Sequence, residues 1–230
     1  MESAATPSGP LPEPGPGPAT GPPPGAGPRP DTGPEPLRRQ ARFLREADQL
    51  KGVARQSSIL DGSRKENSAE HSWHLALMAL VLRDYAPPGT DLNRVTAMLL
   101  IHDLVEIDAG DLFVYADAAA QARQEAAEQA AADRLFTLLP PDQGSGLRAL
   151  WDEFEERRTP EARFARALDR LQPMLANYYL GGGTWQEHGV RAGQVLDKVA
   201  LIADGSATLG EFARELVGSA VRQGFLSPGQ

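Results

Sequence analysis

The sequence contains no cysteine, and this absence excludes disulfide bonds, a thiolate nucleophile and any cysteine-ligated metal site. It also lacks an apolar run of the roughly 18 residues that a transmembrane helix needs. The N-terminus shows no basic stretch followed by an apolar one, which is the pattern of a secretory signal. Together these absences predict a soluble protein of the reducing cytoplasm, without a membrane partner.

Positive charge is scarce as well. The formal net charge is −8 at pH 7. Residues 1–36 carry four acidic residues against one arginine, so −3 lies there and −5 remains for the rest of the chain. An acidic body offers no surface for duplex nucleic acid or an anionic membrane, so no nucleic-acid partner is expected. A small phosphorylated ligand remains compatible, because a metal ion and a few local cations can bind it.

Proline and glycine are concentrated at one end. Residues 1–36 hold 13 of the 20 prolines and 7 of the 23 glycines, a composition that predicts a disordered tail with polyproline-like character. Residues 37–230 are expected to form a single domain. The period of their apolar residues is helical, and no strand is predicted, so the expected fold class is all-α. Helices are expected over about 37–51, 68–85, 91–106, 117–139, 146–157, 160–180, 190–202 and 207–223, with a loop at 53–65 and a flexible joint at Gly181–Gly183.

Two of the four histidines, His71 and His102, lie on apolar helix faces. His71 shares its face with Leu75 and Met78, and His102 follows Met98 by four residues. Taken singly, each is better explained as a core histidine whose ring nitrogens are both hydrogen-bonded. The carboxylates change this balance. Asp103 directly follows His102, and Asp169 sits in another amphipathic helix, where a pair with Arg166 is the alternative.

Burying an unpaired carboxylate is costly, so a divalent cation is a natural partner for these side chains. His71, His102, Asp103 and Asp169 are therefore the candidate metal ligands. Two imidazoles and two carboxylates suit one Mn²⁺, Co²⁺, Fe²⁺ or Zn²⁺ better than Mg²⁺. Such an ion activates water for attack on a phosphate.

Other residues are candidates for proton transfer and phosphate binding. Glu106 follows His102 by one helical turn and is the candidate for handling the proton of the water, although a surface carboxylate at a helix end is the alternative. Arg64 stands in the loop before His71, with Arg55 further back. Arginine binds phosphate in fork geometry, but loop arginines are more often solvated.

These motifs resemble a known family. Glu-Asn-Ser-Ala-Glu-His (66–71), His-Asp-Leu-Val-Glu (102–106), Gly-Asp (110–111) and Ala-Leu-Asp-Arg-Leu (167–171) are similar to the HD-domain 5′-deoxynucleotidases and their bacterial relatives. The resemblance covers roughly residues 40–180. It implies an all-helical HD fold, often dimeric, that holds one divalent metal and hydrolyses nucleoside 5′-monophosphates, preferring deoxyribose.

The resemblance also assigns roles. His71, His102, Asp103 and Asp169 match the family's metal ligands, and Glu106 matches the acidic residue that assists the water. Asp111 matches a substrate-contacting aspartate, and Arg55 falls near the phosphate-binding arginine. One position departs from the pattern: Gln56 stands where characterised members carry a tryptophan that shapes the sugar site.

The expected function is thus metal-dependent hydrolysis of a nucleoside 5′-monophosphate by a homodimer. Two alternatives remain open at this stage. One is another HD-type activity on a pyrophosphorylated or cyclic nucleotide. The other is a nucleotide-binding protein with weak or no catalysis, which the presence of all four candidate ligands argues against.

Overall fold

The computed structural model describes residues 32–229, and helices dominate it. Most of the expected proline-rich tail lies outside the described residues. The first helix begins at Glu35, two residues before the expected boundary. The helices are α1 (Glu35–Ala47), α2 (Ser68–Val81), α3 (Leu92–Ile101), α4 (Glu106–Ala109), α5 (Ala118–Phe136), α6 (Pro141–Glu156), α7 (Pro160–Tyr179), α8 (Gly183–Glu187), α9 (Ala192–Gly205) and α10 (Ala207–Arg222). Short 3-10 turns occupy Asp48–Gly52, Arg83–Tyr85 and His102–Val105.

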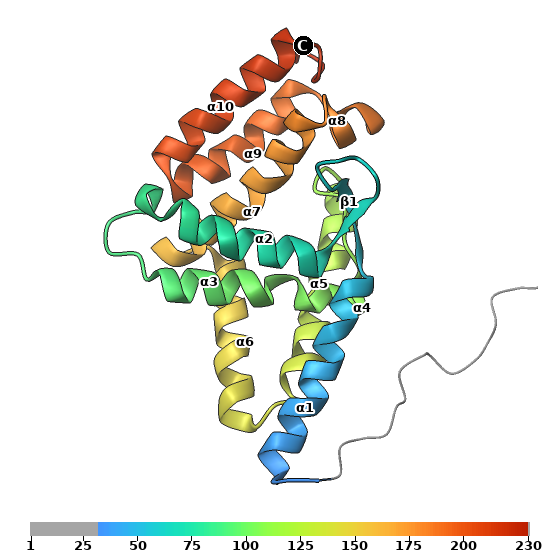
Figure 1. The fold of residues 1–230 in the computed structure, drawn as a ribbon, viewed down its shortest axis with the longest axis vertical. Coiled ribbons are helices and arrows are strands. Elements are labelled where there is room, and N and C mark those ends of the chain that lie inside the picture. Colours follow the sequence, from blue (N-terminus) through green and yellow to red (C-terminus); the bar gives the residue numbers. More distant parts are fainter. Residues whose placement is uncertain (1–31, 230) are drawn as a thin grey trace, which may run out of the picture.

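The helices surround two connected apolar clusters. Helix α7 packs against α2, α3 and α9, and α10 covers α9, so that these five helices enclose the larger cluster. Below it in Figure 1, α1, α5 and α6 extend downward and enclose a smaller cluster around Phe43, Phe136 and Trp151. The all-α class expected from the sequence is confirmed. Among residues 32–229, every helix is too short or too polar to cross a bilayer.

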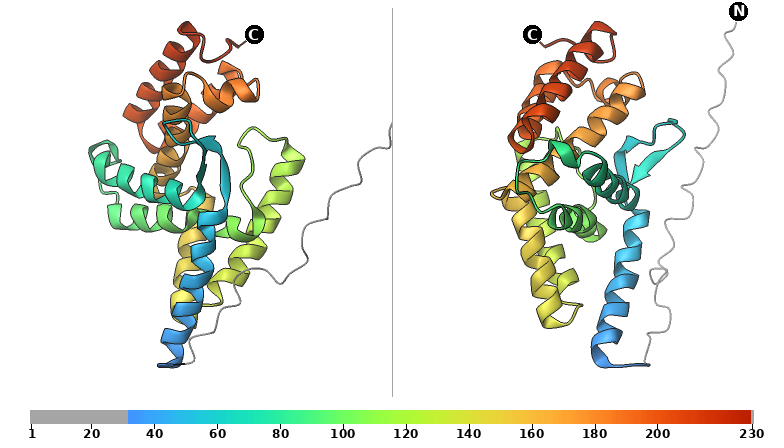
Figure 2. Two further views of the ribbon diagram at one scale, coloured as in Figure 1. Left: turned by 45° about the vertical axis from the view of Figure 1, so that its right-hand side comes forward. Right: turned by 60° about the vertical axis from the view of Figure 1, so that its left-hand side comes forward.

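The expected loop at 53–65 was wrong in part. Strands β1 (Ala54–Ser58) and β2 (Lys65–Asn67) pair antiparallel, with Ala54 opposite Asn67 and Ser58 opposite Lys65. Figure 2 shows this hairpin standing at the start of α2. Strand β1 reads Ala-Arg-Gln-Ser-Ser, which has no alternation of apolar and polar residues, so the usual strand signal is missing. The turn at its tip does follow its sequence, because Gly62 has φ +72°.

Two local differences matter for the site. Asn67 caps α2 by accepting a hydrogen bond from the Glu70 backbone N–H, so the side chain of Ser68, the first residue of the helix, is free for another contact. The helix expected to run to Glu106 ends at Ile101, and His102 and Asp103 lie in a 3-10 turn instead. Helix α7 continues through Pro173 to Tyr179, which keeps Asp169 and the residues after it on one element.

Candidate metal centre

His71 lies in the first turn of α2, where the Asn67–Glu70 capping box fixes the start of the helix. Its ring is fully buried. Nδ1 lies 3.5 Å from Oε2 of Glu66, and Nε2 lies 3.2 Å from Oδ1 of Asp169. A proton on Nδ1, facing Glu66, leaves the lone pair of Nε2 directed at Asp169. This is the tautomer that a metal-binding histidine adopts when a carboxylate holds its other ring nitrogen.

His102 is oriented in the same way, by a backbone carbonyl. Its Nδ1 donates to the carbonyl oxygen of Leu99 at 2.9 Å. Nε2 is buried and has no hydrogen-bond partner among the described residues, although it lies 2.9 Å from Oδ1 of Asp103 and 3.8 Å from Oδ1 of Asp169. The indole N–H of Trp151 donates to the His102 carbonyl and helps to fix the turn. An unpaired imidazole nitrogen facing two carboxylates is the donor arrangement of a cation site.

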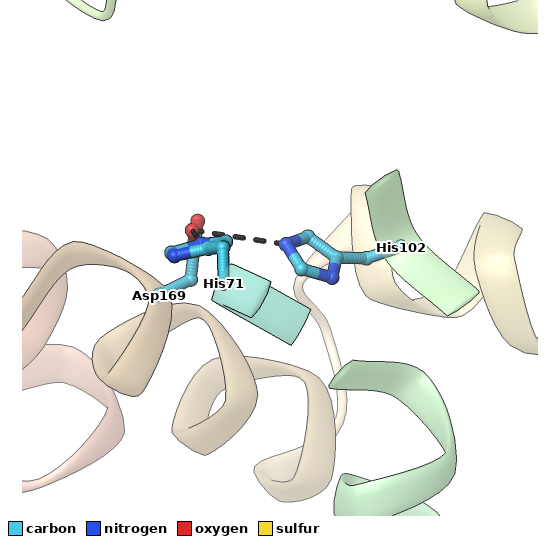
Figure 3. Close-up of side chains that lie close together, drawn as sticks. All are labelled: His71, His102 and Asp169. Carbon is cyan, nitrogen blue, oxygen red and sulfur yellow. Dashed lines mark hydrogen bonds and ion pairs between the residues drawn. The ribbon is translucent and has the colours of Figure 1, made fainter. Parts of the chain in front are cut away.

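These side chains converge on one point. One ligand atom from each of His71, His102 and Asp169 lies within 4.8 Å of the other two, and Figure 3 shows the two rings directed toward the carboxylate. The fourth expected ligand, Asp103, lies at the edge of this group, because its Oδ2 also accepts from Arg55 at 2.7 Å. The residues present therefore fit a divalent ion, and the donors come from α2, the 3-10 turn and α7.

The electrostatics of the cluster favour a positive charge at its centre. Burial opposes the charged imidazole, yet the carboxylates of Asp103 and Asp169 raise the pKa of His102 to about 10. The pKa of the Asp103 carboxyl is lowered in spite of burial, because His102 and Arg55 stabilise its anion. The pKa of Asp169 is also well below its usual range in spite of burial, with Arg170 and the two histidines as causes. The cluster thus holds carboxylates in the form that binds metal.

Arg55 comes from β1 and connects the cluster to two further acidic residues. Its Nη1 lies 2.7 Å from Asp103 and 3.8 Å from both Glu106 and Asp111. Oδ2 of Asp111 also accepts from the backbone N–H of Gln56 at 3.1 Å. The unpredicted hairpin is therefore the element that brings Arg55 and Gln56 to the site.

Glu106 is buried beside this group. The hydroxyl of Ser68 donates to its Oε2 at 2.5 Å, a contact that follows from Asn67 rather than Ser68 capping α2. Burial and the nearby charge of Asp103 raise the pKa of Glu106 well above its ordinary value. A carboxylate whose pKa is raised is a stronger base, which suits proton transfer from a water.

The structure does not bring Arg64 to this group. Its guanidinium is exposed and donates to both carboxylate oxygens of Glu70, at 2.8 and 2.7 Å. It borders a separate, smaller pocket instead. Arg64 directly precedes β2, in the turn of the hairpin, and is paired with Glu70, so its expected phosphate role has no support from its position.

Several charged residues of the site were missed from the sequence. Glu66 is buried, approaches His71 and Arg55, and accepts from the amide of Gln172 at 3.0 Å. Arg166 donates to Asp169 at 3.2 Å, which is the pair that the sequence offered as an alternative for Asp169, and also to Glu155. Glu66 begins the Glu-Asn-Ser-Ala-Glu-His motif (66–71), but the spacing of that motif does not indicate that Glu66 is buried.

A cavity of about 400 Å³ opens beside the cluster. Its wall includes the candidate ligands His102, Asp103 and Asp169, the residues Arg55, Gln56, Glu106 and Asp111, and side chains from α5 to α9. Pockets for small molecules are generally about 300–1,000 Å³ in volume, so a nucleotide-sized ligand fits this space.

Comparison with known proteins agrees with this geometry. The HD domain model matches residues 47–209, which is more than half of the chain. The chain belongs to the HD domain family. The family expected from the motifs is thereby confirmed, and the matched range contains every candidate ligand.

The HD domain of this chain is similar to named relatives. It is 33% identical over 135 residues to the 5′-deoxynucleotidase HDDC2 of Mus musculus, and 31% identical over 134 residues to that of Homo sapiens. Each match covers 58% of this chain and 66% or 64% of the relative, so the chain spans slightly under two thirds of these curated proteins.

Solved structures share the fold. A protein of Magnetospirillum magnetotacticum described as a predicted metal-dependent phosphohydrolase is 51% identical, with a TM-score of 0.81, and the match covers 84% of this chain and 96% of that one. A Pyrococcus horikoshii protein, with a TM-score of 0.55, is 22% identical over 80% of this chain and 99% of that one, and shows the fold alone.

Proposed function

We propose that this HD domain is a metal-dependent phosphohydrolase that converts a nucleoside 5′-monophosphate, preferably a deoxyribonucleotide, to nucleoside and phosphate. The observation that carries the proposal is the buried group of His71, His102 and Asp169, whose donor atoms converge beside Arg55 at the wall of a nucleotide-sized cavity. Relatives named 5′-deoxynucleotidase and metal-dependent phosphohydrolase support the same reaction class.

The residues proposed to hold the ion are His71, His102, Asp103 and Asp169. When bound, a divalent cation supplies a Lewis acid that polarises the phosphate and lowers the pKa of water. The mixed set of imidazoles and carboxylates favours Mn²⁺, Co²⁺, Fe²⁺ or Zn²⁺ over Mg²⁺.

Arg55 is proposed to bind the phosphate. Its guanidinium is nearly buried and faces the cavity, and Asp103, Glu106 and Asp111 raise its pKa, so it stays charged. A guanidinium offers planar, paired donors to phosphate oxygens, and its electrostatic attraction to the phosphate is stronger when water is excluded from the site.

Glu106 is proposed to handle the proton of the attacking water. Ser68 fixes Oε2, and Oε1 lies 3.8 Å from Arg55, which leaves Oε1 available for a water or for the ester oxygen. The raised pKa of the carboxyl suits both acceptance and return of a proton.

The sugar side of the substrate is proposed to meet Asp111 and Gln56. Both line the cavity, and the Gln56 backbone N–H orients the Asp111 carboxylate. Cleavage of a pyrophosphorylated or cyclic nucleotide, or binding of a nucleotide without turnover, are the alternatives that the experiment must separate.

The test is a substrate and metal panel. Purified protein is supplied with Mn²⁺, Co²⁺ or Mg²⁺ and assayed for phosphate release from all deoxy- and ribonucleoside 5′-monophosphates, with cyclic nucleotides and nucleoside polyphosphates alongside. Release of phosphate from the monophosphates, fastest from deoxynucleotides and with Mn²⁺ or Co²⁺, is the expected result. Turnover of only cyclic or pyrophosphorylated nucleotides contradicts the proposal, as does nucleotide binding without any turnover.

Glu106→Gln tests the proton step. The variant keeps the shape of the side chain and the acceptor for Ser68, so metal content and nucleotide affinity should stay near those of the parent. The value of kcat should fall by roughly a hundredfold to ten-thousandfold, the usual range for loss of a general acid–base group. The matched control is Glu125→Gln, which removes a carboxylate from another part of the cavity wall. Parental kcat in Glu106→Gln removes this residue from the mechanism.

A further inference from the structure

The cavity carries a second group of cations that the proposed reaction does not use. Arg157 at the end of α6, Arg166 and Arg170 on α7, and Lys198 on α9 all line it. Two of the four are matched by Glu155, which accepts from Arg166 at 3.0 and 3.1 Å and lies 4.0 Å from Arg157. Arg170 has only an oxygen of Asp169 that Arg166 shares, and Lys198 has no ion pair among residues 32–229.

Arg170 has an ion-pair contact but a buried N–H without a hydrogen bond. Its Nε is buried and has no hydrogen-bond partner among residues 32–229. The nearest carboxylate oxygen, Oδ2 of Asp169, is 3.7 Å from Nε, and Arg166 already approaches that oxygen at 3.2 Å. Since buried N–H groups are nearly always hydrogen-bonded, an arginine that lines a cavity with its buried Nε–H unpaired indicates an acceptor supplied from outside the chain.

Lys198, on the neighbouring helix α9, also has too few partners for its charge. In the described part of the chain its ammonium forms no ion pair or hydrogen bond, and its one aromatic contact is the ring of Tyr115, 5.9 Å away. Burial and the positive charge of Arg170 lower the pKa of Lys198, although Asp197 beside it acts in the opposite direction. The two cations are thus close enough to repel each other, and α7 and α9 pack together to hold them there.

We propose that Arg170 and Lys198 form a second anion subsite, so that the preferred substrate is a phosphomonoester whose leaving group carries another anionic group, such as a nucleoside 3′,5′-bisphosphate. This inference rests on the proposed function, which assigns the scissile phosphate to the metal ligands and Arg55. The leaving group of a simple nucleoside 5′-monophosphate is uncharged and offers neither cation a charged acceptor. A second phosphate supplies the missing acceptors and the missing negative charge. Only the 5′ ester is cleaved, and the second phosphate stays on the product.

The experiment compares two probes that cannot be hydrolysed. They are the 5′-methylenephosphonate analogues of deoxyadenosine 5′-monophosphate, one with a 3′-hydroxyl and one with a 3′-phosphate, titrated into the full-length Mn²⁺-loaded protein by calorimetry. The 3′-phosphate should tighten binding about tenfold or more, the effect of one good charged contact. In Arg170→Met and in Lys198→Met this advantage should fall to within about twofold. Affinity for the 3′-hydroxyl probe should stay near the parental value in Lys198→Met, whereas Arg170→Met removes a charge that also stabilises the Asp169 carboxylate and is compared with the parent only by the ratio of the two probes.

Arg123→Met is the matched control. Arg123 is exposed on α5 and lies outside the cavity wall, so its loss removes one positive charge without touching the subsite. The control should keep the full preference for the 3′-phosphate. Melting temperature and helical circular dichroism identify any variant that does not fold, and the comparison of the two probes on the parent needs no variant at all.

Each other outcome overturns the inference. If the parent binds both probes equally, the second subsite does not exist, while binding of the 3′-hydroxyl probe still supports the proposed function. If Lys198→Met weakens both probes to the same extent, this cation serves the first phosphate. If neither probe binds, the proposed function fails together with the subsite.

Discussion

At the scale of single residues, Glu66 shows how a side chain outside the ligand set can control a ligand. It faces Nδ1 of His71 and is itself held by the amide of Gln172. We expect Glu66→Gln to lower the affinity for Mn²⁺ about tenfold to a hundredfold, because the amide no longer favours the tautomer that presents Nε2. Calorimetric titration of the metal-free protein measures this directly. Glu187→Gln, an exposed carboxylate paired with Lys65, is the control and should keep parental affinity. Equal affinities for all three proteins contradict this role.

A second residue-scale prediction concerns acid stability. Glu153 accepts from Arg94 at 2.9 Å and from the Thr159 hydroxyl at 2.6 Å, and these contacts tie α3, α6 and the start of α7 together. The bond from Arg94 lowers the pKa of Glu153, so its contribution is complete above the unfolded value of about 4.5 and is lost as the pH falls through the lower folded pKa. Glu153→Gln should reduce the free energy of unfolding by about 0.5–1 kcal/mol at pH 7.

Urea unfolding of parent and variant at pH 7 and at pH 3.5 checks the prediction. The difference between the two proteins should shrink at the lower pH, where the parent's carboxylate begins to protonate. Glu156→Gln, which removes an exposed partner of Arg158, should change little at either pH. A difference for Glu153→Gln that grows on acidification rules out the ion pair as its source.

At the scale of elements, the close approach of α9 to α7 positions the helix that carries Asp169. A Cβ at Gly205 would lie 2.2 Å from the carbonyl oxygen of Arg163 and 2.8 Å from Cβ of Ala167. Gly205→Ala should therefore destabilise the protein by about 1–3 kcal/mol, the usual cost of forcing atoms into a packed contact.

The matched change lies on the same helix. Gly193→Ala introduces a Cβ with no heavy atom within 4 Å and should be neutral or stabilising by up to about 1 kcal/mol, because alanine favours helix. Thermal and urea unfolding of both variants measure the difference. Equal stabilities would show that α9 can move away from α7 without cost.

The sequence predicted the long helices better than it predicted where they end, and it missed the short elements between them. Long amphipathic helices such as α7 have a strong period, so their existence was predictable. The hairpin of β1 and β2 was not predictable, because Ala54–Ser58 is short and polar. Its pairing partners, Asn67 and Lys65, lie on a separate segment that no periodic pattern connects to it. The 3-10 turn at His102 was also missed, since it continues the apolar pattern of α3 with a tighter winding.

At the scale of the whole molecule, the sequence predicted which residues meet better than how they are supported. His71, His102 and Asp169 come together because α2, α3 and α7 pack on one core, and their apolar faces were visible in the sequence. The phosphate role predicted for Arg64 is not supported, because its guanidinium pairs with the nearby carboxylate of Glu70. The excess positive charge of Arg170 and Lys198 could not be predicted, because it depends on the packing of α7 against α9. The homodimer stays a prediction, which sedimentation would test.

The central claim is that these three elements build a site for one divalent ion, and metal content tests it most directly. Protein purified and loaded with Mn²⁺, then freed of unbound metal, should contain about one ion per chain by elemental analysis. His102→Ala should contain almost none while keeping its helical circular dichroism, because the loss removes the buried nitrogen between Asp103 and Asp169. His188→Ala, at an exposed histidine outside the cavity wall, should keep one ion. One ion per chain in a folded His102→Ala protein would contradict the account.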